Sequence, residues 1–461
     1  AVGATNALGG LDINSSAGDG DITFSSTIGD SDSAGIVGTT AIGGTDTEDV
    51  NLAGLIYKFD GGTTITAADG DNIKLTGTGN VTFTTAADAI EFATGHIHLG
   101  DGSNLVVDTG ATGGNITIAE IAGTSQETVT LDAGTGTTSV GVIGSGTEIG
   151  TLLIGSDENG GITLNGAITT DGVVTLDGPI TLATGAITIT TADDNINLQG
   201  TVDGGKALTL ASGSGAVTVD GAIGSSTALS SLTVNSSGAG IIEITNIGTS
   251  SAAGVTGATA IGNTNTGTLT FDGTVYTTNA ATFTAATGEN IDLTGAATTT
   301  FTSSNDNITF GTATVEMSDG SHLVVNTDTG TGQINMTGGV MGTSSENVTL
   351  TAGTGTVAIG AIGTGTEIAD VSITSSGDTT LHGDFTGGAL TTTGPVIIAE
   401  NINIGTGAVT FGSTLDSHTG AQTITFNNPG ADINITGAIG GTKPFSTFTI
   451  SDAGTFTYSG G

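Results

Sequence analysis

Two histidines in the stretch GHIHLGDG, His96 and His98, are the first candidates for chemistry in this sequence. They are two positions apart, so on an extended strand both side chains point to the same face. Two imidazole nitrogens on one face suit Zn²⁺ or Cu²⁺. A lone pair of ligands is a weak metal signature, however, and the positions 218 residues further on carry Thr314 and Glu316. We therefore interpret both histidines as solvent-facing strand residues and assign no metal ligand.

Acidic turns are the second candidate, because their carboxylate oxygens suit Ca²⁺. They are GDGD at Gly18–Asp21, DSD at Asp30–Asp32, DGD at Asp69–Asp71 and ADDN at Ala192–Asn195. The RTX nonapeptide and the EF-hand loop are both absent, and Asp and Asn also favour turns through local backbone hydrogen bonds. We expect no cofactor beyond loosely bound Ca²⁺ and assign no cofactor-binding residue.

Two further patterns have a structural and a functional interpretation. Sequons of the type N-x-[ST] begin at Asn80, Asn115, Asn307, Asn347 and Asn434. They are either glycosylation acceptors or outward polar residues of a strand ladder, and we expect the latter. Threonine arrays at Thr82–Thr85 and Thr188–Thr191 could form the flat face of an ice-binding solenoid, but the high β-propensity of Thr accounts for them equally well.

Composition excludes several classes of function. The 461 residues include 44 acidic and only four basic side chains, all of them Lys, for a formal net charge of −40. No basic patch for nucleic acid can be assembled, and an anionic membrane would repel the chain. We see no apolar run long enough to span a bilayer, so no membrane insertion is expected. Plausible partners are divalent cations, cationic surfaces or further copies of the chain. The absence of Cys rules out disulfides.

Short strands must position these residues. Between Gly161 and Val219, runs such as Ile162–Leu164 and Val174–Leu176 alternate apolar residues with Thr, and DG, TG and GG turns separate them. This is the period of a half-buried strand, and it recurs roughly every 7 to 12 residues, whereas no helical period appears. The pattern predicts an all-β fold, a right-handed parallel β-helix (β-solenoid). With roughly 20–30 residues per coil, the chain would make about 15–23 coils.

A long internal repeat organises the strands. GDNIKLTG at Gly70–Gly77 returns as GENIDLTG at Gly288–Gly295, and DGSNLVVDT at Asp101–Thr109 returns as DGSHLVVNT at Asp319–Thr327, both 218 positions later. The sequence therefore predicts one continuous rod with a first copy at 1–220, a second at 221–436 and the start of a third at 437–461.

One phrase marks the joints between the copies. It opens the chain at Ala1–Ser16, recurs at Gly221–Ser237 and returns at Gly437–Gly454. The two ends should thus present similar coils, each with an unpaired strand edge that can template another chain. No polar capping repeat is recognisable at either end. We expect either a segment of a longer repeat protein or ends that meet neighbouring molecules.

The phrase GAIGSSTALSSLTVNSS at Gly221–Ser237 resembles the β-strand repeats of very large bacterial surface and secreted proteins. These are similar to filamentous-haemagglutinin-type adhesins and autotransporter passenger domains. The resemblance spans essentially the whole chain. It implies a parallel β-helix outside the cell, at the bacterial surface, that acts as an adhesin, surface layer or filament. It transfers no catalytic residue to this chain.

Enzymatic activity is not expected. Polysaccharide-cleaving β-helices need a basic group for a uronate, or paired carboxylates beside aromatic platforms. This chain has no Arg and no Trp, and only 4% of its residues are aromatic. We assign no catalytic residue. The leading hypothesis is a structural subunit or segment of an extracellular bacterial surface filament or layer that assembles by end-to-end stacking. The alternative is the stalk or binding module of a large secreted adhesin.

Overall fold

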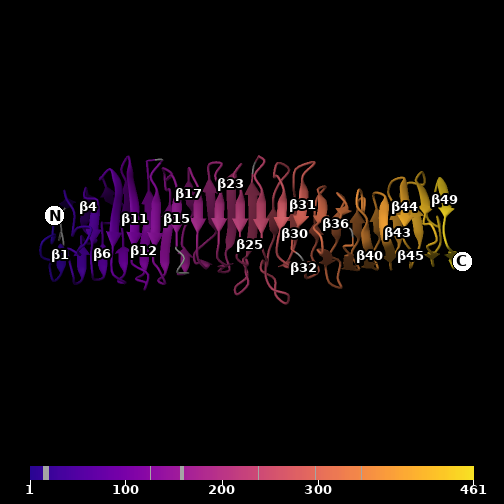
Figure 1. Ribbon diagram of the computed structural model, residues 1–461, viewed down its shortest axis with the longest axis horizontal. Helices are drawn as coiled ribbons and strands as arrows, with labels where there is room; N and C mark the ends of the chain where they lie inside the picture. The colour runs from indigo at the N-terminus through magenta and orange to yellow at the C-terminus, as the bar shows by residue number, and fades with distance from the viewer. Residues whose placement is uncertain are drawn as a thin grey trace. The chain divides into compact units, whose positions relative to one another are not determined.

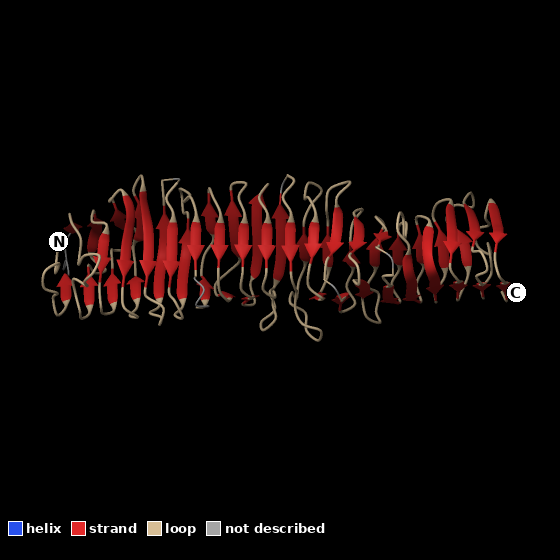
Figure 2. Ribbon diagram, viewed as in Figure 1, coloured by secondary structure: helices blue, strands red, loops and turns tan. Residues whose placement is uncertain are grey.

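The computed structural model describes residues 1–13, 20–124, 126–155, 160–236, 238–295, 297–343 and 345–460. The chain divides into two compact units, Ala1–Gly221 and Ala222–Gly461. The described residues form strands and loops without a helix, and the fold is a parallel β-solenoid of about 18 turns in all (Figure 2). None of them forms a helix that is long and apolar enough to cross a membrane. The all-β parallel solenoid is confirmed, whereas its right hand and the tandem copies remain predictions.

The strands of the first unit form three parallel ladders, which we call faces one, two and three. Figure 1 shows the stacked strands from one side. In chain order the strands are β1 (Leu11–Ile13), β2 (Gly20–Phe24), β3 (Thr40–Ile42), β4 (Thr47–Leu52), β5 (Ile56–Lys58), β6 (Thr63–Ile65), β7 (Asn72–Leu75), β8 (Gly79–Thr84), β9 (Ile90–Phe92), β10 (His96–Leu99), β11 (Ser103–Asp108), β12 (Ile116–Ala122), β13 (Val129–Asp132), β14 (Thr138–Ile143), β15 (Leu152–Ile154), β16 (Ile162–Leu164), β17 (Ile168–Thr170), β18 (Val174–Leu176), β19 (Ile180–Leu182), β20 (Ile187–Thr191), β21 (Ile196–Leu198), β22 (Val202–Asp203), β23 (Ala207–Gly213) and β24 (Val217–Val219).

Every strand of this unit pairs in parallel with its equivalent in the neighbouring coil. Face one runs β1–β3–β6–β9–β12–β14–β16–β19–β22. Face two runs β2–β4–β7–β10–β12–β14–β17–β20–β23. Face three runs β5–β8–β11–β13–β15–β18–β21–β24. The long strands β12 and β14 contribute to faces one and two.

The second unit has the same three-faced plan. Its strands are β25 (Ser231–Ser236), β26 (Ile242–Ile244), β27 (Thr259–Ile261), β28 (Leu269–Phe271), β29 (Val275–Thr278), β30 (Ala281–Phe283), β31 (Asn290–Leu293), β32 (Thr298–Ser303), β33 (Ile308–Thr309), β34 (Thr314–Met317), β35 (His322–Asn326), β36 (Ile334–Met336), β37 (Val340–Met341), β38 (Val348–Gly353), β39 (Val357–Ile359), β40 (Ile368–Ser375), β41 (Thr379–Leu381), β42 (Phe385–Thr392), β43 (Val396–Ile398), β44 (Ile402–Thr406), β45 (Val409–Phe411), β46 (Leu415–Ser417), β47 (Thr423–Asn427), β48 (Ile433–Ile435), β49 (Thr447–Asp452) and β50 (Phe456–Tyr458). One of its ladders runs β26–β28–β31–β34–β37.

The core follows from the two-residue period of the strands. In β18, Val174 and Leu176 are buried, while Thr175 between them is half-buried on the outer side. Repetition of this pattern places Val, Ile and Leu in stacked interior rows, where burial of apolar surface stabilises the fold. Aromatic side chains also contribute to the core. Tyr57 stacks on Phe83 with ring centroids 4.8 Å apart, and Phe92 meets Phe83 edge-on at 5.2 Å.

Polar side chains join one coil to the next at the turns. Carboxamide and carboxylate oxygens accept backbone N–H groups from the following coil, as Asn195 does from Ala216 at 2.9 Å and Asp193 does from Ser214 at 2.8 Å. Buried hydroxyls close the turns themselves, and Thr109 Oγ1 donates to the Gly114 carbonyl at 2.6 Å. These bonds satisfy turn backbone groups that strand pairing leaves free.

Candidate functional site

The two histidines lie on the outer side of face two in the first unit. Strand β10 carries His96 and His98 outward, while Ile97 between them is buried. Across the ladder, His96 Nε2 lies 3.2 Å from Glu120 Oε2. His98 is in register with Lys74 on β7. The prediction that both histidines share one outward face is confirmed.

An ion pair joins β4 and β7, two neighbouring strands of the same face. The Lys74 ammonium donates to Asp49 Oδ2, and Asp49 Oδ1 accepts the Asn72 backbone N–H at 3.1 Å. Partial burial raises the pKa of Asp49, but the hydrogen bonds from Lys74 and Asn72 and the charge of Lys74 outweigh it, and the net shift is downward. We call Asp49, Lys74, His96, His98 and Glu120 the polar strip.

The polar strip pairs charges along the coil stack but does not form a metal centre. Within the described residues, no group of three or more His, Cys, Asp or Glu side chains is placed to hold a metal ion. The register puts the Lys74 cation beside His98, an arrangement that disfavours a second cation at that row.

At the positions 218 residues later, the second unit carries side chains of different charge on paired parallel strands. Strands β31 and β34 place Asp292 in register with Glu316, 218 positions after Lys74 and His98. Glu316 Oε2 accepts the Asn290 side-chain amide at 2.6 Å. Burial raises the pKa of Asp292, and the nearby carboxylates of Glu316 and Glu289 raise it further. The two positions that hold Lys74 and His98 in the first unit thus hold a pair of carboxyl groups in the second.

The acidic turns use their side chains mainly for backbone hydrogen bonds. Asp30 Oδ1 accepts the N–H groups of Asp32 and Ser33 at 2.9 and 2.8 Å. In the stretch Gly18–Asp21, Gly18 and Asp19 lie outside the described residues, and Asp21 Oδ1 accepts the Asp49 N–H at 3.2 Å. Asp69–Asp71 lie in the turn before β7. Within the described part of the chain, they belong to no cluster of potential metal ligands. The local hydrogen bonding expected of turn Asp is therefore present at Asp30, whereas Asp21 bonds to the next coil.

Of the sequon asparagines expected to be ladder residues, Asn80 and Asn434 lie within β8 and β48, whereas Asn115, Asn307 and Asn347 immediately precede β12, β33 and β38. Side-chain oxygens of four of them accept hydrogen bonds from the next coil: Asn80 from Asn104 Nδ2 (3.1 Å), Asn115 from Thr137 N (3.0 Å), Asn307 from Gln333 N (2.9 Å) and Asn347 from Asp370 N (3.1 Å). Asn434 lies at the centre of β48, in register with Thr410 and Thr457. A glycan on any of the four engaged amides would have to be accommodated beside an inter-coil bond.

The threonine arrays divide between the surface and the core. In Thr82–Thr85, Thr82 and Thr84 face outward, and Thr85 is buried with its hydroxyl donating to the Asp88 carbonyl at 2.5 Å. In Thr188–Thr191, Thr191 is likewise buried. A longer outward row crosses face one, where Thr117, Ser139, Thr163 and Thr181 are in register. Sequence alone did not reveal this row, because its members are 18 to 24 residues apart along the chain.

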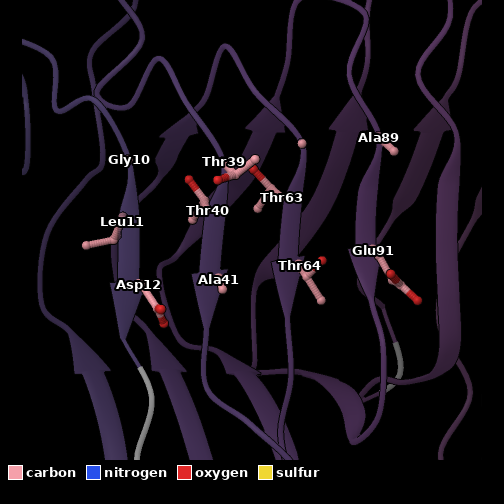
Figure 3. Close-up of a pocket in the computed structure, with 11 residues that line it drawn as sticks. Gly10, Leu11, Asp12, Thr39, Thr40, Ala41, Thr63, Thr64, Ala89 and Glu91 are labelled. Atoms are coloured by element: carbon pink, nitrogen blue, oxygen red, sulfur yellow. The ribbon is translucent and has the colours of Figure 1, made fainter.

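A groove of about 620 Å³ lies on the outer side of face one (Figure 3). Asp12, Ala41, Thr64 and Glu91 form one row across β1, β3, β6 and β9. The neighbouring row includes Gly10, Thr39, Gly62 and Ala89. The hollow forms because the side chains in both rows are short. The carboxylates of Asp12 and Glu91 border it. This groove offers hydroxyl and carboxylate oxygens but no base–nucleophile pair.

Two buried glutamates were missed by the sequence analysis. Glu127 and Glu346 are 2% and 0% exposed. The carboxylate of Glu346 accepts the backbone N–H of Thr343 at 2.8 Å and of Ser345 at 3.1 Å, and the Thr343 hydroxyl at 2.9 Å. Glu127 makes the same bonds with Thr124 and Gln126. Their recurrence in GTSQETVTL and GTSSENVTL, at Gly123–Leu131 and Gly342–Leu350, was the available signal.

No family model, no curated protein and no solved structure matches this chain. Function is therefore argued from the residues and contacts described above.

Proposed function

We propose that this chain is a structural, non-catalytic segment of an extracellular bacterial surface filament or layer, in which β-solenoid coils stack end to end. The observation that supports this most is the way each coil is joined to the next. Parallel backbone ladders run along every face, and Asn and Asp side chains add bonds between coils. Several side chains that were candidate ligands, among them His96, Asp21 and Asp193, are engaged in such contacts.

Apolar residues at a coil edge favour stacking. Phe456 and Tyr458 on β50 are in register with the buried Ile433 and Ile435 of β48. Their side chains are nevertheless 40% and 47% exposed. A further coil, from the same chain or from another molecule, would cover them and add to the stabilising apolar burial.

Charge favours association along the coils over association side by side. The net charge of −40 makes lateral contact between copies repulsive at low salt. Divalent cations are the proposed partners that would relieve this repulsion, bound loosely by surface carboxylates. The proposed extracellular location at a bacterial surface rests on the resemblance of the repeats.

Assembly of the purified chain tests the proposal. We expect concentration-dependent end-to-end polymers in sedimentation and electron microscopy at physiological salt, with Ca²⁺ favouring bundles. Phe456→Glu should suppress polymers, whereas Leu153→Glu should not, since Leu153 is an exposed residue in the middle of β15 on face three. A chain that stays monomeric at high concentration with Ca²⁺ would contradict end-to-end stacking. That result would favour the stalk or binding module of a large secreted adhesin.

A further inference from the structure

The second unit contains two carboxyl groups held side by side with little to neutralise them. Asp292 on β31 and Glu316 on β34 face outward in register. Adjacent parallel strands lie about 4.8 Å apart, so two ionised carboxylates at one register position repel each other. Asp292 Oδ1 is shielded from solvent and has no hydrogen-bond partner.

The surrounding groups add negative charge. Glu289 immediately precedes β31, and its carboxylate acts on Asp292. The neighbouring strand β28 presents Thr270 in register with Asp292, and Asp272 follows that strand. On β26, Glu243 is in register with Thr270.

No basic side chain is placed to compensate them. Lys443 is the only Lys of the second unit, and the chain has no Arg. His322 begins β35, and His382 and His418 follow β41 and β46. None of these strands pairs with β28, β31 or β34.

We propose that Asp292 and Glu316 share one proton, and that this proton stabilises the second unit in acid. The proton resides on Asp292, whose carboxyl O–H donates to the carboxylate of Glu316. Glu316 remains the acceptor, because its Oε2 already receives the Asn290 amide. Protonation removes one of the two adjacent charges and gives the carboxyl group of Asp292, whose Oδ1 is shielded and lacks a partner, a hydrogen bond.

The sign of the effect on stability follows from the raised pKa of Asp292. The folded state binds this proton more tightly than the unfolded chain does. The contribution is therefore complete below the unfolded pKa of about 3.9 and is lost as the pH rises through the folded-state pKa. The substitution Asp292→Asn removes the ionisable group but retains the shape.

The experiment compares wild type and Asp292→Asn by chemical unfolding from acid to neutral pH. We expect the variant to be the more stable protein at neutral pH and to lose that advantage toward pH 4. The matched control is Asp132→Asn in the first unit. Asp132 is also in register with a carboxylate, Asp108, but the two accept the N–H groups of Gly134 and Gly110 at 2.8 and 2.7 Å. The Asp132→Asn control should be no more stable than wild type at neutral pH.

A direct titration keeps the proposal testable if the variant folds poorly. Carboxyl NMR of wild type should show Asp292 titrating above its ordinary pKa, and Glu316→Gln should lower that pKa. An Asp292 that titrates at its ordinary pKa would overturn the proposal. So would saturable stabilisation by Ca²⁺ at neutral pH that Asp292→Asn abolishes, because the pair would then hold a cation rather than a proton.

Discussion

Tyr57 and Tyr276 make the same hydrogen bond in coils 219 positions apart. Each hydroxyl oxygen accepts the backbone N–H of a glycine three residues earlier, Gly54 or Gly273, at 2.9 Å. Tyr276 also donates its hydroxyl to the Ile244 carbonyl at 2.8 Å. Both rings are fully buried, so a turn in each unit is tied to the aromatic part of its core.

Removal of the Tyr57 hydroxyl should therefore destabilise the first unit. Tyr57→Phe leaves the Gly54 N–H without its acceptor and should cost about 1–2 kcal/mol. Burial raises the pKa of Tyr57 to about 12. Its contribution to stability is complete below the unfolded pKa of about 10 and is lost as the pH rises toward 12.

The raised pKa of Tyr57 can be measured by alkaline titration. The tyrosinate absorbance of wild type minus that of Tyr57→Phe reports the ionisation of Tyr57. Tyr458→Phe is the control for the loss of a hydroxyl, because Tyr458 is 47% exposed. A Tyr57 that ionises near pH 10 while the protein is still folded would contradict the prediction.

The buried glutamates should be among the most sensitive polar positions. Glu127→Ala and Glu346→Ala each leave turn N–H groups without an acceptor and should cost about 2–3 kcal/mol. Hydrogen exchange of the amides in each turn, together with chemical unfolding, measures the effect. Glu148→Ala and Glu367→Ala are matched controls, since both side chains are exposed. Equal effects at buried and exposed positions would show that the buried carboxylates do not hold the turns.

The pair Lys74–Asp49 should make a small contribution that depends on pH. Lys74→Met should destabilise the protein at neutral pH by at most about 1 kcal/mol, because the Lys74 side chain is partly exposed. The folded pKa of Asp49 lies below its ordinary value of 3.8. The contribution is therefore present above about pH 4 and is lost as the pH falls through the folded-state pKa.

Unfolding curves from neutral to acidic pH test this pair. Lys443→Met serves as the control, because the Lys443 ammonium donates to the His418 carbonyl at 2.6 Å rather than to a carboxylate. A Lys74→Met deficit that persists unchanged below the folded-state pKa of Asp49 would rule out the ion pair as its source.

Close coil contact should make one glycine irreplaceable. A Cβ at Gly407 would lie 0.9 Å from the Gly388 carbonyl oxygen in the adjacent coil. Gly407→Ala should therefore cost about 3 kcal/mol or more, measured as a loss of protection in the amides of β42 and β44. Gly62→Ala is the control, because nothing lies within 4 Å of its Cβ position. A tolerated Gly407→Ala would mean that the coils can separate there.

The repeating elements of the fold were predictable because their signal is local. Val174, Thr175 and Leu176 show the strand period directly, and the outward placement of His96 and His98 follows from the same period. The contacts between coils were harder to predict. The pairing of His96 with Glu120 depends on where each coil closes, and coil length varies with every turn.

In the candidate site, too, residue positions were predictable from the sequence, whereas burial and contacts were not. The sequence placed Asp292 at the repeat position of Lys74 and Glu316 at that of His98, but it did not indicate that Asp292 would be partly buried beside Glu316. The buried state of Glu127 was also unexpected, because isolated Glu residues usually lie on surfaces. Its recurrence at Glu346 was visible, yet only the turn geometry shows that each carboxylate serves its own backbone.

The Asn and Asp bonds between coils have a direction. In those of Asn115, Asn195, Asn307 and Asn347, the accepting side chain belongs to the earlier coil and the N–H to the later one. A coil that has already formed thus presents oriented acceptors to the chain that comes after it. Such a solenoid is suited to folding vectorially as it emerges amino terminus first, with each finished coil acting as the template for the next.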